Sequence, residues 1–399
     1  MADYNQMLVL DLVRRSRGIS RVELVRETGL TAQTVSNICR RLSDADLIRE
    51  TGRVSAGTGG APRTIFEVNA SGRFTIGLHI DPARLTFVVF TLAGDIVQRL
   101  SMRTPDTPEP EAMLAEIELR IRQLIEAAGV PTDRVAGIGV ATPGPIDVLH
   151  GSVRDAPNLP GWEDVGLRAE LERRLGLPVV VEKDTTAAAL GELWSSPRPP
   201  QNFAFVYLGT GAGAGIVLDG EVRRGASSNL GNIGHMSGDP NGPICPCGGR
   251  GCLSLTALPA TLVGEAAARG LVASVDLGDA RAVEKAFAEL CAVAVDHPGG
   301  EEAAIVDRAA RSYARVASQL ANALDLEAIV FGGPQWPALM SAVLRIAPPL
   351  ISKAFLFRAL HDVETRGAST NDDVGAVGAA SLAMWATTFD APTQLFLPI

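Results

Sequence analysis

The chain has 399 residues, of which 46% are apolar and 20% are charged, and this length suits two or three globular domains. No uninterrupted apolar run is long enough to span a bilayer and no charged-then-apolar start indicates export, so we expect a cytoplasmic protein without a membrane partner. The net charge of −9 argues against nucleic-acid binding by the chain as a whole.

The charge is unevenly distributed along the chain. Residues 1–63 contain ten arginines and seven acidic residues, a charge of +3, whereas the remainder carries −12. A mildly basic head on an acidic body is suited to a local contact with phosphate groups.

The basic head has the pattern of two short helices separated by a glycine turn. Apolar residues at near-helical spacing predict a first helix over residues 4–17. Ser20, with an acidic residue three positions later, matches a capping box that begins the next helix, and Gly29 is a suitable C-cap. Thr31 begins a third helix that runs through Leu42. This order predicts a helix-turn-helix, followed by a strand, a glycine-rich tip and a strand over residues 49–66.

The third helix carries polar side chains suited to base edges and phosphates, while Val35 and Ile38 are expected to face the core. The alternative is a small helical domain with a solvated arginine face. On the first interpretation the predicted DNA-contacting set is Ser20, Arg21, Thr31, Gln33, Thr34, Ser36, Asn37, Arg40, Arg41 and Arg63.

From residue 74 the pattern changes to alternating strands and helices. Strands over 74–80 and 85–90 flank the turn Asp81-Pro82-Ala83-Arg84, in which Pro82 lacks an N–H donor, so we expect a simple hairpin turn. The remaining predicted elements are a helix over 111–128, strands over 134–141, 177–182 and 203–208, helices over 258–270, 280–295 and 301–325, a strand with a glycine turn over 326–333, a strand near residue 362 and a helix over 374–386.

A second glycine-rich turn, GTGAGAG, follows the strand that ends at Leu208. Such a turn is weak evidence for a phosphate-binding loop. Because the first turn lacks the glycines that let a backbone approach phosphate, we favour a close-packed hairpin here as well.

Three of the five cysteines lie within eight residues, in the stretch GNIGHMSGDPNGPICPCGGRGCLS over residues 231–254. Cys245 and Cys247 follow His235, and a glycine-rich return lets a short loop bring Cys252 to the same point. One imidazole and three thiolates form a ligand set that a tetrahedral structural zinc prefers. The odd cysteine count disfavours a disulfide, and the glycine and proline content disfavours a group of core thiols.

Two of these motifs resemble one family. GHM followed by CPCGGRGCLS is similar to the GHM…CxCGxxGCLE signature of the ROK family (repressors, open reading frames, sugar kinases), and SRVELVRETGLTAQTVSNICRRL resembles the helix-turn-helix segment of its repressors. The resemblance covers about residues 5–386. It implies an α/β chain with a winged helix-turn-helix over 1–70 and a two-lobed, actin-like (ribonuclease H-like) ROK domain. The first lobe would span 71–183, the second lobe with the zinc loop 184–373, and a C-terminal helix over 374–388 would return to the first lobe.

The resemblance also implies a sugar site. In the family the zinc shapes a sugar-binding loop, and its histidine ligand, here His235, contacts the sugar. The segments DAPNLPGW and EKDTTAAALGE resemble family segments whose asparagine meets sugar hydroxyls and whose aspartate takes a hydroxyl proton, which places these roles on Asn158 and Asp184. In a repressor the aspartate would only bind, so we expect a vestigial base and no catalytic residue.

The chain departs from the family pattern at several of these positions. The implied effector-binding set is Asn158, Lys183, Asp184, Asn232, His235 and Ser254, in which Lys183 replaces an asparagine and Asn232 and Ser254 each replace a glutamate. Lys183 could pair with Asp184 or Glu182, or it could meet an acidic or phosphorylated ligand. Family kinases carry DxGGTK at the first hairpin turn, where this chain has Asp81-Pro82-Ala83-Arg84, so we expect no enzyme activity.

Together these features predict a transcriptional regulator, a repressor that a sugar or sugar derivative releases from a double-stranded DNA operator. We expect structural Zn²⁺ as its cofactor and a homodimer or tetramer as its assembly. Two alternatives stay open: an ATP-dependent sugar kinase with a fused DNA-binding head, favoured by Asp184 and the second glycine turn, and a DNA-binding regulator controlled by a protein partner, favoured by the changes at positions 183, 232 and 254.

Overall fold

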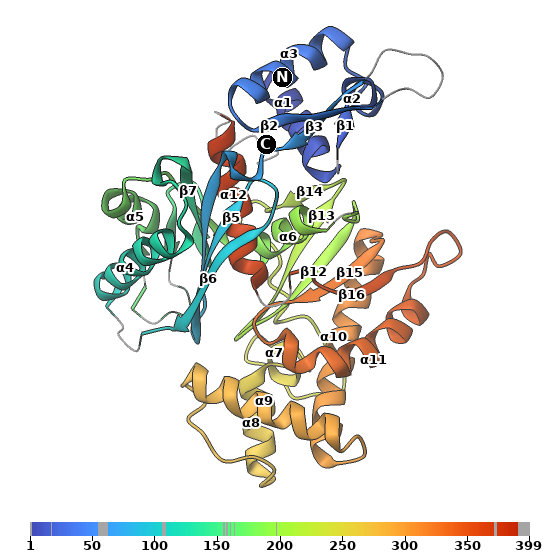
Figure 1. The fold of residues 1–399 in the computed structure, drawn as a ribbon. Coiled ribbons are helices and arrows are strands. Elements are labelled where there is room, and N and C mark those ends of the chain that lie inside the picture. Colours follow the sequence, from blue (N-terminus) through green and yellow to red (C-terminus); the bar gives the residue numbers. More distant parts are fainter. Residues whose placement is uncertain are drawn as a thin grey trace.

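The computed structural model describes residues 2–16, 18–54, 63–105, 109–154, 156, 159, 161–162, 164–196, 198–370 and 373–389. A small head, built from the N-terminal elements, lies at one end of a larger body with two lobes (Figure 1). Across the described ranges, no helix has both the length and the apolar character needed to cross a membrane.

The head is a winged helix-turn-helix, as the sequence predicts. The Ser20 hydroxyl and the Glu23 side chain cap each other's backbone N–H groups at the start of the second helix, and Gly29, with a φ of 68°, ends it. The strands form a sheet in the order β1-β3-β2. The elements are α1 (Ala2–Arg15), β1 (Ile19–Ser20), α2 (Arg21–Thr28), α3 (Ala32–Asp44), β2 (Ile48–Val54) and β3 (Arg63–Val68). The expected glycine-rich tip of the wing falls largely in residues 55–62, outside the described residues.

The hydrophobic core of the head continues into the body. Val35 and Ile38 of α3 are buried in it, as expected from the sequence. The same cluster of buried side chains contains Phe90, Trp194 and Met384, which belong to the body. The head is therefore packed against the body through apolar side chains.

The first lobe contains a five-stranded sheet in the order β11-β7-β4-β5-β6. Strands β4, β5 and β6 are antiparallel, and β7 and β11 are parallel to β4. Helices α4 and α5 cover one face (Figure 1). A small sheet of β8, β9 and β10 shares their hydrophobic core. The elements are β4 (Phe74–Ile80), β5 (Arg84–Thr91), β6 (Ile96–Arg103), α4 (Pro110–Ala128), β7 (Val135–Thr142), β8 (Ile146–Asp147), β9 (Ser152–Arg154), β10 (Asp164–Val165), α5 (Leu167–Leu175) and β11 (Val179–Lys183).

The second lobe repeats this plan. Its sheet has the order β14-β13-β12-β15-β16, again three antiparallel strands followed by two parallel ones. The matching strand order supports the duplicated, actin-like architecture that the sequence implies. The elements are β12 (Phe203–Leu208), β13 (Ala212–Leu218), β14 (Glu221–Arg223), α7 (Leu253–Thr256), α8 (Pro259–Ala268), α9 (Ala280–Asp296), α10 (Glu301–Leu324), β15 (Ala328–Gly332), α11 (Trp336–Ala354) and β16 (Glu364–Gly367).

Two helices join the lobes, namely α6 (Asp184–Ser195) and α12 (Val374–Thr388). They pack against each other, α12 also lies on β4 and β7, and α6 also lies on β12 and β13 (Figure 1). A Cβ atom on Gly378 would lie 1.6 Å from the Ala187 carbonyl oxygen, so only glycine fits at this crossing. The C-terminal helix therefore packs on the sheet of the first lobe.

The structure also contains elements that the sequence patterns did not indicate. Strand β6 and the helices α5 and α11 were not expected, and α11 includes Pro348 and Pro349, residues that usually interrupt a helix. The two glycine- or proline-containing turns join paired antiparallel strands: β4 and β5 pair around Asp81–Arg84, and β12 and β13 pair around residues 209–211.

Candidate functional site

The exposed face of α3 gathers most of the predicted DNA-contacting residues. The Gln33 amide and the Arg40 guanidinium both donate to the Asn37 side-chain oxygen, each at 3.3 Å, which aligns these three side chains along the helix. Arg40 and Arg41 are exposed, and Thr34 and Ser36 are partly exposed. Since Val35 and Ile38 fill the opposite face, the polar face is free to meet another molecule.

Other members of that set lie around α3 and have partners within the head. Ser20 is buried, and its hydroxyl donates to the Glu23 carboxylate at 2.7 Å. The Arg21 guanidinium lies 4.8 Å from the Phe66 ring centre and forms an ion pair with Glu50 at 3.5 Å. The Thr31 hydroxyl caps α3 by accepting from the Thr34 N–H at 3.2 Å. Arg63, at the start of β3, is exposed.

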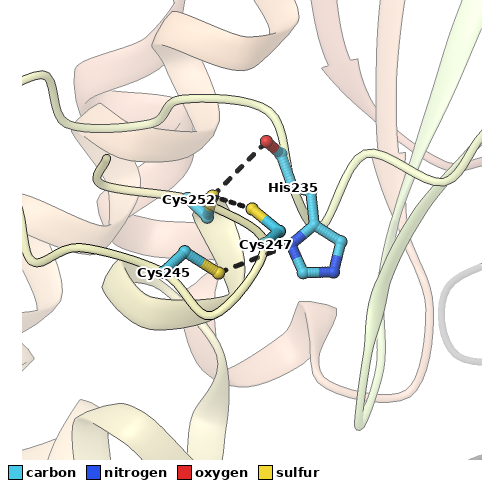
Figure 2. A group of neighbouring side chains, drawn as sticks. All are labelled: His235, Cys245, Cys247 and Cys252. Carbon is cyan, nitrogen blue, oxygen red and sulfur yellow. Dashed lines mark hydrogen bonds between the residues drawn. The ribbon is translucent and has the colours of Figure 1, made fainter. Parts of the chain in front are cut away.

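The predicted metal ligands converge at one point. The ligand atoms of His235, Cys245, Cys247 and Cys252 all lie within 4.8 Å of one another (Figure 2). The Cys247 and Cys252 sulfurs are 3.5 Å apart, and the Cys245 sulfur is 3.5 Å from His235 Nδ1. Three sulfurs and one nitrogen at such spacing fit a tetrahedral metal ion with no open position.

Local backbone geometry builds this cluster. The Cys245 N–H donates to the Gly249 carbonyl at 2.7 Å, which closes a tight turn, and Gly248 takes a φ of 89° within it. Hydrogen bonds to the Cys247 sulfur, the first of them from the Gly249 N–H, lower the pKa of its thiol to about 7. Gly251 also has a positive φ, and a Cβ there would lie 1.5 Å from the Asp239 carbonyl oxygen. The glycines of the motif are therefore required by the turn.

A polar pocket of about 390 Å³ lies beside this cluster, between the two lobes. The Ser254 N–H donates to the Gly234 carbonyl at 2.9 Å, so the loop that carries the His/Cys cluster holds Ser254 next to His235. The side chains of Asn232 and Ser254 have no hydrogen-bond partner in the described part of the chain. Five of the six implied effector-binding residues line the pocket, namely Lys183, Asp184, Asn232, His235 and Ser254. The sixth, Asn158, lies outside the described residues.

Two buried carboxyl groups line the same pocket. Asp184 begins α6, and its carboxylate accepts from the Thr185 N–H at 2.7 Å. Burial raises the pKa of Asp184 to about 6. Asp81, in the first hairpin turn, accepts from the Ala83 N–H at 2.9 Å, and burial raises its pKa to about 7. With a pKa below neutral pH, Asp184 is mostly ionised there and can accept hydrogen bonds from ligand hydroxyls, whereas Asp81 is only partly ionised.

Several pocket residues were not indicated by the sequence patterns. Tyr207 lines the pocket, and its hydroxyl lies 3.0 Å from His79 Nε2, while burial lowers the pKa of His79 to about 4. The Thr185 hydroxyl, also in the pocket, is buried without a hydrogen-bond partner in the described part of the chain. Asn229 lines the entrance and exchanges hydrogen bonds with the Ile146 N–H and carbonyl at 2.9 and 2.8 Å. Its amide thereby ties a loop of the second lobe to the first lobe.

Lys183 forms no ion pair with Asp184 or Glu182 in the described part of the chain, although such a pair was one of the two roles considered for it. Its ammonium donates to the carbonyls of Asn229 and Leu230 at 3.2 and 2.9 Å. The preceding residue, Glu182, is buried and forms an ion pair with Arg224 at 2.7 Å instead. Desolvation lowers the pKa of Lys183, which remains partly accessible at the pocket wall.

The first hairpin turn contacts the opposite lobe. Asp81 and Arg84 exchange backbone hydrogen bonds at 3.1 and 3.2 Å, which closes the turn. The Arg84 side chain then pairs with Glu284 of α9 at 3.2 Å. The turn thus forms an ion pair with the second lobe.

The far end of α6 contacts the head. The Arg14 guanidinium of α1 lies 4.2 Å from the Trp194 ring centre and donates to the Trp194 carbonyl at 2.8 Å. A second cavity, of about 430 Å³, lies at this junction and is lined by α1, the end of α6, the β13–β14 turn and Trp385. One helix therefore begins in the polar pocket and ends against the DNA-binding head.

Two family models match the chain. The model described as ROK family matches residues 75–385, and the model described as MarR family matches residues 3–56.

Individual relatives include repressors and kinases. The chain is 33% identical over 250 residues to a putative xylose repressor of Caldicellulosiruptor sp. (strain Rt8B.4), a match that covers 62% of each protein. It is 30% identical to a glucokinase of Halalkalibacterium halodurans over 77% of this chain and 94% of the kinase. A solved ROK family transcriptional regulator, described as a homolog of the E. coli MLC protein, superposes with a TM-score of 0.74 at 25% identity and covers 96% of each chain.

Proposed function

The chain belongs to the ROK family, and from this premise we propose that it is a sugar-responsive DNA-binding regulator that represses transcription until an effector releases it. The observation that carries this proposal is the joining of two sites by one helix: α6 runs from the polar pocket at Asp184 to the head at Trp194. A DNA target also implies a cytoplasmic location.

The head is proposed to bind a double-stranded operator through α3. Its exposed Gln33 and Arg40 and its partly exposed Asn37 suit base edges and phosphates in the major groove. Around them lie Thr31, Thr34, Ser36, Arg41 and Arg63. Ser20 and Arg21 would act by shaping the head, because both side chains are engaged within it. In a homodimer, or a tetramer built from dimers, two heads would meet successive major grooves about 34 Å apart.

The His/Cys cluster is proposed to hold structural Zn²⁺. The donor set of one imidazole and three thiolates suits this ion, which would supply no chemistry because all four positions are filled by the protein. Its role would be to fix the loop that places His235 and Ser254 at the pocket.

The pocket is proposed to bind the effector. Asp184, Asn232, His235 and Ser254 offer hydrogen-bond acceptors and donors for sugar hydroxyls, and Asn158 is carried over from the family pattern. Ligand binding would change the closure of the two lobes and thereby the spacing of the heads. The boundaries proposed for these units are 1–70 for the head, 71–183 with 374–388 for the first lobe, and 184–373 for the second.

An ATP-dependent sugar kinase is the second candidate. The buried Asp184 at the pocket and the relation to a glucokinase favour it. The first hairpin opposes it, because Pro82 has no backbone N–H and the N–H groups of Ala83 and Arg84 already donate to Asp81. Release of ADP with sugar, ATP and Mg²⁺ would identify the kinase. A third candidate is a DNA-binding regulator controlled by a protein partner, and the result that no sugar binds would favour it.

Thermal stability of the full chain across sugars and sugar derivatives, with and without ATP and Mg²⁺, tests this proposal. A ligand at 100 times its Kd should stabilise the fold by about 2.7 kcal/mol. A shift with a sugar and none with ATP supports the regulator, a shift with ATP supports the kinase, and no shift with any sugar counts against a sugar effector.

A further inference from the structure

We propose that the effector is a monosaccharide bearing an acidic group, a carboxylate or a phosphate, and that Lys183 is the residue that recognises this group. The inference rests on the proposed function, in which the pocket between the lobes binds a sugar. It narrows the class of ligand from sugars in general to anionic sugar derivatives.

The hydrogen bonds of Lys183 leave part of its ammonium available. A lysine ammonium has three N–H donors, and two of them point at the carbonyls of Asn229 and Leu230. These two contacts fix the ammonium at the pocket wall. The third donor has no protein partner in the described part of the chain. Carbonyl oxygens orient a cation but carry no formal charge, so the third donor can still bind an anionic group.

The carboxylates nearest in sequence do not neutralise this ammonium by direct contact. Glu182 is committed to Arg224 in a buried pair at 2.7 Å. Asp184 accepts from the Thr185 N–H and makes no ion pair with Lys183 in the described part of the chain. An anionic ligand group at the third donor would form the charge-assisted hydrogen bond that the protein itself does not supply.

The other side chains that line the pocket include the carboxyl groups of Asp81 and Asp184 and the uncharged polar groups of Asn232 and Ser254. Asn232 and Ser254 have side chains without hydrogen-bond partners in the described ranges, and neither would repel an anion. The buried Thr185 hydroxyl also lacks a partner, and such a group indicates a ligand or water atom that completes it. Asp184 supplies an acceptor for ligand hydroxyls, so the pocket offers separate groups for the two ends of an acidic sugar.

The volume of the pocket agrees with this class of ligand. At about 390 Å³ it falls in the range of small-molecule sites, which is enough for one monosaccharide with an acidic substituent. A wholly apolar ligand would leave the uncommitted side chains of Thr185, Asn232 and Ser254 unsatisfied, which costs affinity.

Calorimetric titration of the full chain with matched sugars tests the proposal. The probes are D-xylose with D-xylonate, and D-glucose with D-gluconate, D-glucuronate and D-glucose 6-phosphate. We expect at least one acidic member to bind at least tenfold more tightly than its neutral partner. Comparison of the carboxylates with the phosphate identifies which acidic group is recognised.

Three variants assign the preference to Lys183. Lys183→Met should abolish the tenfold preference, whereas Lys183→Arg, which keeps the positive charge, should retain at least part of it. Lys285→Met removes the same charge from an exposed position on α9 and should change nothing. Neutral sugars that bind as tightly as the acids would overturn the acidic-ligand proposal and leave the proposed function standing. Binding of no sugar, neutral or acidic, would remove the proposed function as well.

Discussion

The Arg14 guanidinium stacks on the Trp194 ring at 4.2 Å and donates to the Trp194 carbonyl at 2.8 Å, so the last turn of α1 rests on the last turn of α6. Arg14 is almost fully buried, with a side-chain exposure of 5%. Trp194 also packs edge-to-face against Trp385 of α12, with ring centres 5.2 Å apart. This contact connects the head to the far end of the helix that begins at the polar pocket.

Arg14→Ala is expected to reduce the coupling between effector and operator. Coupling free energies are typically 1–3 kcal/mol, which corresponds to an effect of the effector on operator affinity of about 5- to 150-fold. In the variant, the ratio of operator affinity without effector to operator affinity with effector should fall by about tenfold. The effector affinity without DNA should stay within about threefold. Fluorescence anisotropy with and without effector measures the ratio.

Arg15→Ala is the matched control for that variant. Arg15 pairs with Asp11 at 2.7 Å, as Arg14 also does, but it does not stack on Trp194. Equal losses of coupling in the two variants would mean that charge on α1, rather than the contact with Trp194, carries the effect.

Removal of the metal should unfold the loop and weaken effector binding. We expect about one zinc per chain by elemental analysis, and loss of the metal in Cys247→Ser, because three ligands no longer fill a tetrahedral structural site. The melting midpoint should fall and the effector affinity should drop at least tenfold. Cys291→Ala alters a cysteine outside the cluster and should keep the metal. Full metal content in Cys247→Ser would exclude the assigned ligand set.

The free energy of unfolding should depend on pH because Asp184 has a raised pKa in the folded state. Its folded pKa of about 6 exceeds the reference value of 3.8, so the folded state binds more protons between these values and stability falls as pH rises through this window. Asp184→Asn should therefore be more stable than the natural chain at pH 8, by roughly 1 to 3 kcal/mol, and similar to it near pH 4. Denaturant unfolding at both pH values measures the difference.

The same variant should bind the effector at least tenfold more weakly, since a carboxylate acceptor is lost. A variant that is less stable at pH 8, or that binds the effector as tightly as the natural chain, would contradict the role given to Asp184.

Arg40→Ala should weaken operator binding by about 1 to 3 kcal/mol, the usual value of a lost base or phosphate contact. If Arg40 meets a phosphate, the slope of log affinity against log salt should also decrease by about one. Arg173→Ala removes the same charge from an exposed site on α5 of the first lobe and serves as the control. Similar losses in both variants would indicate a general charge effect rather than a contact by α3.

Much of this fold follows from local sequence signals, and the exceptions have physical causes. Capping residues and apolar spacing predicted α2 and α3, and the Cys and His spacing predicted the metal cluster, because each depends on residues close in sequence. Helix α11 was missed because Pro348 and Pro349 normally interrupt a helix, yet here they lie in its second half.

The sequence did not predict the long-range contacts, for a different reason. Arg14 and Trp194 are 180 residues apart in the chain, and neither carries a motif that indicates the other. The carbonyl contacts of Lys183 likewise depend on where the loop at residues 229–230 lies, which only the folded lobes determine.

The most direct test of the central claim is the affinity of the full chain for an operator selected from the host's own genomic DNA, measured as each sugar and sugar acid is added. The account predicts specific, salt-dependent binding and a loss of at least fivefold in affinity with one effector, without any need for ATP. A chain that binds no specific DNA, or whose DNA affinity is unchanged by a sugar derivative that does bind the pocket, would contradict it.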